Sequence, residues 1–351
     1  MYMYLYLSDI QLDGFLLGVN FHGFRCASHQ NNSHDLKPPK EYISDSFKIF
    51  KEARIQYIRF PLYWESYEKN PEGFIEELDT FSSTADEYNI SCVYDNHQWE
   101  CSSYFGEGIG FPSSLFVNSF EPDPSSSKKP SIQQLRKFWN GWWDRKLKTK
   151  DGQDAWDAQL DFILEIIKKV KNKRSTIGFE ILNEPQVCRQ IDFRKVGNYH
   201  DHIIKNISAI TDKPLFFCFT FAAALGVINF PWEQAKAKPS ANVRNNIILD
   251  VHPYPPNFLT MGYYKMVSSL MNNITVCVGE FNAGTREWVT INERQFKLYI
   301  KSLKQFNISA AAFWEWSYKI DDTHPAFNIA KVINDKIYPN RNFEVFFNIA
   351  R

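Results

Sequence analysis

The chain has 351 residues, a length that fits either two or three ordinary domains or one α/β barrel. Its 40 Lys and Arg residues balance 40 Asp and Glu residues, so the net charge is zero, which argues against a nucleic-acid partner. Hydrophobic residues make up 44% of the chain, which excludes wholesale disorder, and the 16% aromatic content fits a bulky core or a binding cleft lined with flat rings.

The N-terminal segment does not look like a secretory signal. Residues 1–7 are apolar, but the basic residues, the longer hydrophobic stretch and the small-residue cleavage site of a signal peptide are not convincing here. We therefore expect an intact N-terminal segment and favour a cytoplasmic over a secreted protein, with an unusual or truncated signal as the alternative. Residues 215–232 carry no charge, but Gly226 and Pro231 favour a buried strand and an apolar loop over a membrane span.

The six cysteines are scattered, with no CxxC pair and no Cys/His spacing typical of a metal site. Cys92, Cys218 and Cys277 lie inside apolar, strand-like runs, where a thiol behaves as a small buried hydrophobe. We expect structural thiols and no metal or organic cofactor. The alternative is a disulfide among the other three: Cys26, Cys101 and Cys188.

Eight short apolar runs alternate with helical patterns along the chain. The predicted strands cover residues 16–21, 57–61, 91–96, 177–183, 215–220, 247–252, 275–280 and 309–314. The clearest helix, at residues 154–173, has apolar residues at i, i+3, i+4 and i+7, Asp154 as its cap and lysines at its end. The alternation predicts a single (β/α)8 TIM barrel over residues 1–351 rather than an open doubly wound sheet. No GxGxxG motif follows the first strand, so dinucleotide binding is unsupported.

A long aromatic-rich loop follows the third strand, at residues 100–153. Its Ser/Pro/Lys-rich part, residues 121–131, indicates a solvated loop, and we expect the whole stretch to be an excursion on the catalytic face. Trp139, Trp142 and Trp143 have helical spacing, which is more typical of a core-facing stripe than of sugar contacts.

Functional groups of such barrels lie at the C-terminal ends of the strands. In this chain the groups at these ends are Arg59, His97, Asn183, Glu184, His252, Tyr254, Glu280 and Trp314. Polar and charged side chains at the ends of apolar strands need a common partner, because an isolated buried charge is expensive.

Glu184 and Glu280 end the fourth and seventh predicted strands, on opposite sides of the barrel mouth. Two carboxyl groups facing one another across a sugar suit glycoside hydrolysis, in which one protonates the leaving oxygen and the other attacks or activates water. The pKa values of the two must differ, and donors such as Arg59 and the Tyr254 hydroxyl would keep the attacking carboxylate ionised. The alternative is that both glutamates are structural ion-pair partners.

This ordered set resembles glycoside hydrolase family 5, the cellulase and mannanase family of retaining (β/α)8 enzymes, over about residues 16–319. The resemblance implies that Glu184 is the acid/base and Glu280 the nucleophile, with their carboxyl groups about 5–5.5 Å apart. It further implies sugar 2-hydroxyl binding by Asn183, orientation of Glu280 by Arg59 and Tyr254, contacts to the sugar or the acid/base by His97 and His252, and a −1 subsite floor formed by Trp314. Family 1 fits less well, because its Glu-Asn-Gly motif is absent after Glu280.

Each of these residues also has a structural interpretation. Arg59 could form an ion pair inside the barrel, and the two histidines could be core residues with satisfied hydrogen bonds. Trp316 competes with Trp314 for the platform role, because strand alternation would place both on one face; we favour Trp314.

We expect a monomeric retaining β-glycosidase acting on an oligo- or polysaccharide, a β-linked glucan, mannan or related β-glycoside. Three alternatives stay open: a transglycosylase, a glycolipid-directed glycosidase on the same site, and a non-catalytic saccharide-binding barrel. The apolar residues 105–116 would suit a lipid aglycone, but they would equally suit a packed loop.

Overall fold

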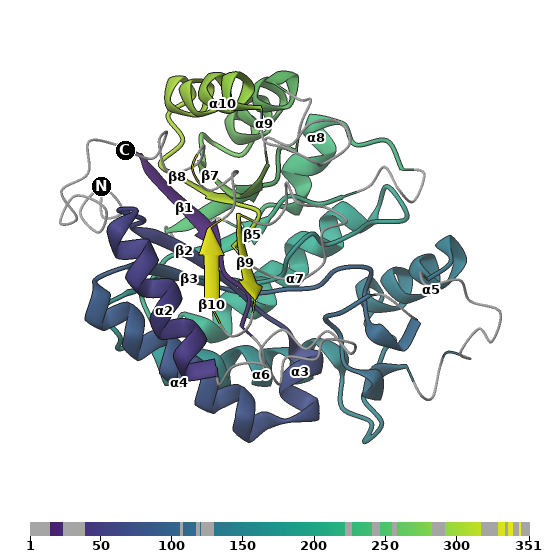
Figure 1. The fold of residues 1–351 in the computed structure, drawn as a ribbon. Coiled ribbons are helices and arrows are strands. Elements are labelled where there is room, and N and C mark those ends of the chain that lie inside the picture. The colour runs from purple at the N-terminus through teal and green to yellow at the C-terminus, as the bar shows by residue number, and fades with distance from the viewer. Residues whose placement is uncertain are drawn as a thin grey trace.

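The computed structural model describes residues 15–23, 39–105, 108–116, 120, 130–221, 227–240, 246–254, 258–282, 292–316, 329–333, 336–339 and 344. Eight parallel strands form a closed barrel, in which each strand pairs with the next and the eighth pairs with the first (Figure 1). They are β1 (Leu16–Asn20), β2 (Tyr57–Leu62), β3 (Ser91–Asn96), β4 (Thr176–Glu180), β5 (Leu215–Cys218), β6 (Ile247–Val251), β7 (Thr275–Phe281) and β8 (Ala310–Phe313). The predicted TIM barrel is confirmed.

Helices surround the barrel (Figure 1). They are α2 (Pro39–Glu52), α3 (Trp64–Lys69), α4 (Pro71–Tyr88), α5 (Ile132–Trp143), α6 (Ala155–Val170), α7 (Asp192–Ile207), α8 (Pro231–Gln234), α9 (Phe258–Leu270) and α10 (Glu293–Gln305). Short 3-10 turns are η2 (Ser103–Phe105), η3 (Ser113–Leu115) and η5 (Ala235–Ala237). A separate antiparallel pair consists of β9 (Ala330–Ile333) and β10 (Lys336–Pro339), and β10 contacts helix α2.

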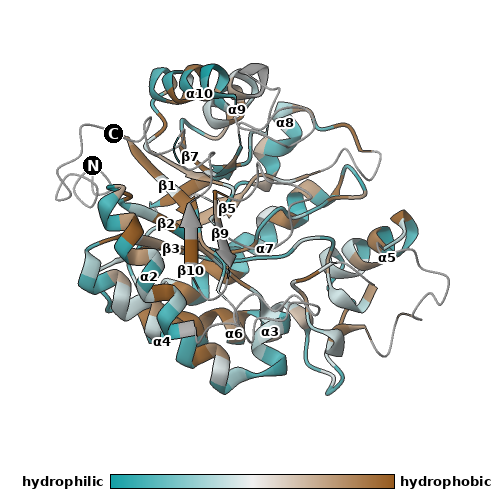
Figure 2. Cartoon of the chain, viewed as in Figure 1, coloured by the Kyte–Doolittle hydropathy of each residue, from teal (hydrophilic) through white to brown (hydrophobic). Residues whose placement is uncertain are grey.

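The helix signals of the sequence have clear local causes. The Asp154 side chain accepts a hydrogen bond of 3.0 Å from the Trp156 amide and so caps α6, whose last turn carries Lys168 and Lys169. The helix predicted at residues 45–53 begins earlier, at Pro39, because proline is tolerated in a first turn where its missing N–H would have no partner. Figure 2 shows the outcome: the outer helices carry both hydrophilic and hydrophobic residues, while strands such as β1 are mostly hydrophobic.

The long segment between β3 and β4 packs its aromatic residues inward. Phe105, Phe111 and Phe116 are buried, and the Phe111 ring lies 4.8 Å from Trp142. Trp139 and Trp142 are fully buried on α5, which lies to one side of the barrel (Figure 1). These tryptophans therefore form a core stripe, and the apolar segment is a packed loop rather than an open lipid groove.

The cysteines described by the structure are free thiols: Cys92, Cys101, Cys188, Cys218 and Cys277. Cys101 and Cys188 are therefore not bonded to one another, and a disulfide that involves Cys26 is not tested because Cys26 lies outside the described residues. In the described part of the chain, no helix is long and apolar enough to cross a membrane.

The barrel interior has an apolar lower layer and an ionic upper layer. Side chains of a strand alternate between its two faces, so the apolar Tyr57 is followed on the same face by Arg59, and Val93 by Asp95. The lower layer closes the bottom of the barrel with a hydrophobic cluster: Leu16, Tyr57, Val93, Phe216, Ile248, Cys277, Ala310 and Ala312. The upper layer supports the mouth.

Two glycines offer a matched test of this packing. A Cβ at Gly18 in β1 would lie 2.1 Å from the Tyr57 carbonyl oxygen, so Gly18→Ala forces the β1 and β2 backbones apart. We expect it to lower the free energy of unfolding by about 1–3 kcal/mol. The exposed Gly262 in α9 has nothing within 4 Å of that position, so Gly262→Ala is expected to raise it by about 0.5–1 kcal/mol. Urea denaturation distinguishes the two, and effects of the same sign would contradict the packing argument.

Candidate active site

Arg59 is the centre of the upper layer. Its fully buried guanidinium uses every nitrogen, and its partners are Glu180 Oε2 at 2.8 Å, Glu280 Oε1 at 2.9 Å, Asn20 Oδ1 at 3.0 Å, Asn183 Oδ1 at 2.8 Å and Asp95 Oδ2 at 3.0 Å. Burial alone would lower the pKa of Arg59, but the adjacent carboxylates raise it well above its usual value, so the group stays cationic. Arg59 therefore joins β1, β3, β4 and β7 at the level of the mouth.

Glu280 lies near the end of β7, with its side chain 5% exposed. One carboxylate oxygen accepts from Arg59, and the other accepts a 2.6 Å hydrogen bond from the Tyr254 hydroxyl. Burial and the Glu280 charge raise the pKa of Tyr254 well above its usual value, so the phenol keeps its proton and donates it. Both oxygens of Glu280 thus have donors, which is the arrangement that stabilises a carboxylate anion.

Glu184 lies in the turn after β4, which ends at Glu180 and not at Asn183 as predicted. The strand ends early because the chain turns into the mouth, where Glu184 adopts a left-handed φ of 41°. Non-glycine residues in this region are strained and cluster at functional sites. The Gln98 side chain holds the turn by donating to the carbonyls of Asn183 at 3.1 Å and Glu184 at 3.0 Å.

The two glutamates meet across His252, which directly follows β6. His252 Nδ1 lies 2.7 Å from Glu184 Oε1 and 3.7 Å from Glu280 Oε2, and one atom from each of the three side chains lies within 4.8 Å of the others. The Glu184 side chain is 22% exposed and so faces the solvent side of the mouth. The structure therefore brings together the two carboxyl groups that the sequence singled out.

Aromatic rings cover the other side of the mouth. Trp314 is stacked on His97 with ring centroids 5.4 Å apart and 17° between the planes. His97 Nδ1 in turn pairs with Asp95 Oδ2 at 2.6 Å, and its Nε2 lies 3.3 Å from Asn183 Nδ2. Trp314 is thus placed beside the carboxylates, where a sugar ring could lie against it.

Trp316 corrects the alternation argument. It does not share a face with Trp314, because β8 already ends at Phe313 and strand alternation does not extend beyond it. Trp316 is fully buried, donates to Ser46 Oγ at 3.0 Å and packs on Phe50 in α2. Its place is in the outer core.

The protein has a clear family relationship. The model of the cellulase family, glycosyl hydrolase family 5, matches residues 18–320. The chain belongs to glycoside hydrolase family 5. It is therefore a glycoside hydrolase, and its substrate is a saccharide. The match includes all eight barrel strands except the first two residues of β1, and every candidate residue described above.

Solved structures of several glycosidases share the fold of this family 5 enzyme. An endogalactoceramidase is 14% identical, with a TM-score of 0.71 over 97% of this chain and 82% of that chain. Endo-glycoceramidase II from Rhodococcus sp., in complex with ganglioside GM3, is 11% identical, with a TM-score of 0.67 over 95% and 78%. The catalytic domain of a Thermobifida fusca endoglucanase is 17% identical, with a TM-score of 0.54 over 87% and 80%. No curated protein sequence matches this chain.

Several buried residues around the mouth were missed by the sequence argument. They are Asn20, His22, Asp95, Gln98 and Glu180. Asp95 and Glu180 lie on the barrel-facing side of the predicted strands, so their signal was a charge within an apolar run rather than after its end. Burial raises the pKa of Glu180 well above its usual value despite the Arg59 contact.

His252 is held between charged neighbours. Burial alone would lower its pKa, but the Cys218 sulfur, the Glu280 carboxylate and Asp250 outweigh burial and raise the pKa well above its usual value. Burial would conversely raise the pKa of Asp250, yet its pairing with His252, together with Arg59, holds that pKa below its usual value. With a proton on Nδ1, His252 donates a hydrogen bond to Glu184 Oε1 at 2.7 Å.

Tyr254→Phe tests the hydrogen bond to Glu280. The variant removes one donor from a buried carboxylate and changes no packing atom, so we expect kcat/KM to fall by about 10–100-fold, the equivalent of about 1.5–3 kcal/mol for a hydrogen bond to a charged group. Tyr263→Phe, which removes the bond from that hydroxyl to the Asn229 carbonyl, is the matched control and should stay near wild type. Equal losses in both variants would refute a specific role for Tyr254.

Proposed function

We propose that this family 5 enzyme is a retaining β-glycosidase in which Glu280 is the nucleophile and Glu184 the acid/base. The observation that carries the proposal is the approach of the two carboxyl groups, with oxygens within 4.8 Å of one another. Retention needs carboxyl groups about 5–5.5 Å apart, whereas inversion needs about 6.5–9.5 Å to leave room for a water molecule. The short separation favours direct attack by Glu280.

In the first step, Glu280 attacks the anomeric carbon while Glu184 gives its proton to the glycosidic oxygen. The C–O bond to the leaving group breaks, and a glycosyl ester to Glu280 forms. Arg59 and Tyr254 hold the two Glu280 oxygens, so the attacking carboxylate keeps one orientation. We assign binding of the sugar 2-hydroxyl to Asn183, and its contacts to Arg59 and to the Asn96 backbone support this by fixing its position at the mouth.

In the second step, Glu184 takes a proton from a water molecule that attacks the same carbon, and the ester bond to Glu280 breaks. Two displacements restore the original anomeric configuration. His252 lies 2.7 Å from Glu184 and compensates its negative charge when the proton has left. Trp314, stacked on His97, would form the floor beneath the sugar in the −1 subsite.

A β-linked glucan, mannan or related oligosaccharide is the first substrate class we propose. A glycolipid is a second, because an exposed apolar group lies after β5, in the loop before α8 and at the start of that helix. Phe230 and Trp232 stack at 4.5 Å and are 39% and 55% exposed, and Ile228 is 62% exposed. Glu184 follows the neighbouring strand β4, and the leaving group lies on the side of the acid, so these residues are placed for an apolar aglycone. Two of the structures with a similar fold are glycoceramidases, and this also supports a glycolipid substrate.

The stereochemical outcome tests the mechanism. Proton NMR of a β-glycoside digest should show the β-anomer of the released sugar first, with the α-anomer appearing only as mutarotation proceeds. Early α-anomer would indicate inversion and refute the proposal. Binding without turnover on any substrate would favour the non-catalytic alternative.

The substrate class is tested on a panel of β-glucans, β-mannans, an aryl β-glycoside and glycosylceramides in mixed micelles. Trp232→Ala should lower glycosylceramide turnover selectively and leave the aryl glycoside rate near wild type. Leu298→Ala, which removes a 49% exposed hydrophobic residue from α10, is the matched control. An equal effect of both variants on glycosylceramide would remove the case for a lipid substrate.

A further inference from the structure

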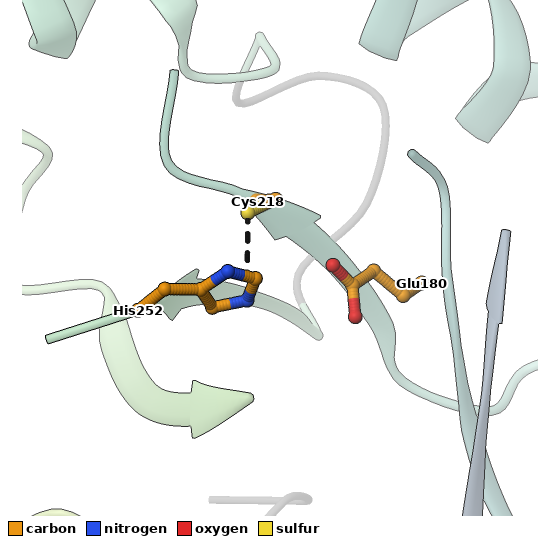
Figure 3. A group of neighbouring side chains, drawn as sticks. All are labelled: Glu180, Cys218 and His252. Atoms are coloured by element: carbon orange, nitrogen blue, oxygen red, sulfur yellow. Dashed lines mark hydrogen bonds between the residues drawn. The ribbon is translucent and has the colours of Figure 1, made fainter. Parts of the chain in front are cut away.

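Three different ligand types converge directly beneath the mouth. Glu180 ends β4, Cys218 ends β5 and His252 follows β6, three neighbouring strands of the barrel (Figure 3). One ligand atom from each side chain lies within 4.8 Å of the other two, and all three residues are buried. The proposed catalytic steps use only the Nδ1 side of His252, so its Nε2 side, which faces Cys218, touches none of the reacting groups.

The geometry of the cluster matches a small tetrahedral metal. Cys218 Sγ and His252 Nε2 are 3.8 Å apart, and zinc bonds of about 2.3 Å to sulfur and 2.0–2.1 Å to nitrogen place two such ligands about 3.6 Å apart. Glu180 Oε2 accepts from Arg59, but Glu180 Oε1 is buried and accepts no hydrogen bond from any residue that the structure describes. The Glu180 carboxyl also interacts with Asp250, and a cation would replace the proton that two adjacent buried carboxyl groups otherwise need.

The surrounding charge also favours a cation. Asp95, Glu180 and Asp250 lie around the single guanidinium of Arg59, and Asp250 Oδ2 is 3.7 Å from His252 Nε2. In a water-poor interior these carboxyl groups hold protons or positive charge tightly, and a bound ion would take the place of the protons on Glu180 and His252. A set of one thiolate, one imidazole and one carboxylate selects zinc-like ions over magnesium or calcium, which prefer oxygen ligands.

We propose that Glu180, Cys218 and His252 form a binding site for a thiophilic divalent cation, Zn²⁺ or Cd²⁺, and that the bound ion inhibits the enzyme. On binding, the Cys218 thiol, the Glu180 carboxyl and the Nε2 position of His252 release any proton they hold to solvent, and water completes the coordination. The ion holds the His252 ring, which contacts Glu184, and places a positive charge below the sugar. The oxocarbenium-like transition state is itself positive, so the ion raises its energy.

A second group of side chains at the mouth could also bind a metal ion, so the experiment must distinguish the two sites. Glu184, His252 and Glu280 also lie within 4.8 Å of one another, and an ion bound to them would inhibit by direct contact with the proposed catalytic carboxylates. This upper group contains no sulfur. The two sites share the His252 ring but use opposite nitrogens, so a sulfur-specific signal separates them.

The experiment titrates the full-length, metal-free protein with Co²⁺ and Cd²⁺ and records thiolate-to-metal charge-transfer absorption and bound metal per chain. Wild type should bind one ion with a charge-transfer band. Cys218→Ser should lose the band and bind at least about tenfold more weakly. Cys277→Ser is the matched control, because Cys277 is also buried near Asp250, with its sulfur 3.4 Å from Asp250 Oδ1, yet lies outside the cluster; it should keep the band.

Inhibition is measured in parallel, with each variant's rate compared with its own rate in chelator. Zn²⁺ should inhibit wild type and Cys277→Ser reversibly, and Cys218→Ser should need at least about tenfold more Zn²⁺. Absence of a band in wild type, a band that persists in Cys218→Ser, or unchanged inhibition of that variant would overturn the proposal. The absorption and stoichiometry need no turnover, so they test the site even if the proposed glycosidase activity fails. If Cys218→Ser does not fold, X-ray absorption of the wild-type complex decides whether sulfur is a ligand.

Discussion

Replacing Glu280 by glutamine is expected to lower kcat by on the order of 10⁵-fold while the fold stays intact. The amide has the shape of the carboxylate but cannot form the glycosyl ester, and Arg59 and Tyr254 keep their positions around it. Initial rates on an aryl β-glycoside, with circular dichroism and thermal denaturation for the fold, provide the measurement.

Two controls make this result specific. Glu233→Gln changes another buried glutamate, which pairs with Lys236 outside the mouth, and should keep nearly full activity. Glu280→Ala with added azide should form an α-glycosyl azide, because the small anion then attacks from the side that Glu280 has vacated. Wild-type-like hydrolysis by Glu280→Gln would end the assignment of the nucleophile.

Replacing Arg59 by methionine is expected to lower the free energy of unfolding by about 3–5 kcal/mol. The methionine side chain fills the space of the arginine methylene groups. Asp95, Glu180 and Glu280, however, lose the buried guanidinium that they share. Breaking a buried ion network costs this much because the remaining charges are left without compensation. Activity should fall as well, since Glu280 loses one of its two donors.

Urea denaturation measures the loss of stability. The control is Arg145→Met, because Arg145 is 40% exposed and pairs with Asp154 and Asp157 at the surface, where about 1 kcal/mol or less is expected. If Arg59→Met does not fold, Arg59→Lys keeps the charge but loses the planar fork, and it should fall between wild type and the methionine variant. Equal losses for Arg145→Met and Arg59→Met would contradict the central role of Arg59.

Much of the fold could be predicted because the positions of strands and helices depend on short-range sequence patterns. The eight strands were each located within a few residues, since short apolar runs bounded by polar turns are strong signals. Asp154 and the lysines of α6 marked a helix start and end through interactions within one turn. The boundary of β4 was missed by three residues, because whether a chain continues in a strand or turns depends on its neighbours in the barrel.

The candidate site divides in the same way. Glu184, Glu280 and the other end-of-strand residues were identified because barrel topology places strand ends together, and their roles stay proposals. Asp95 and Glu180 were missed because a charged residue within a strand has no visible partner in the sequence. Only barrel closure brings both to the single guanidinium of Arg59.

The amino-acid sequence alone determined the class of fold, the positions of its strands and the family to which the protein belongs, because these depend on short-range patterns and on an ordered set of residues. The tertiary structure decided which Trp faces the mouth, that Glu184 and Glu280 approach one another, and that Cys218 and His252 meet below them. Such contacts join residues 30 to 100 or more positions apart, and their energies depend on distance and burial, which the linear order of residues does not contain.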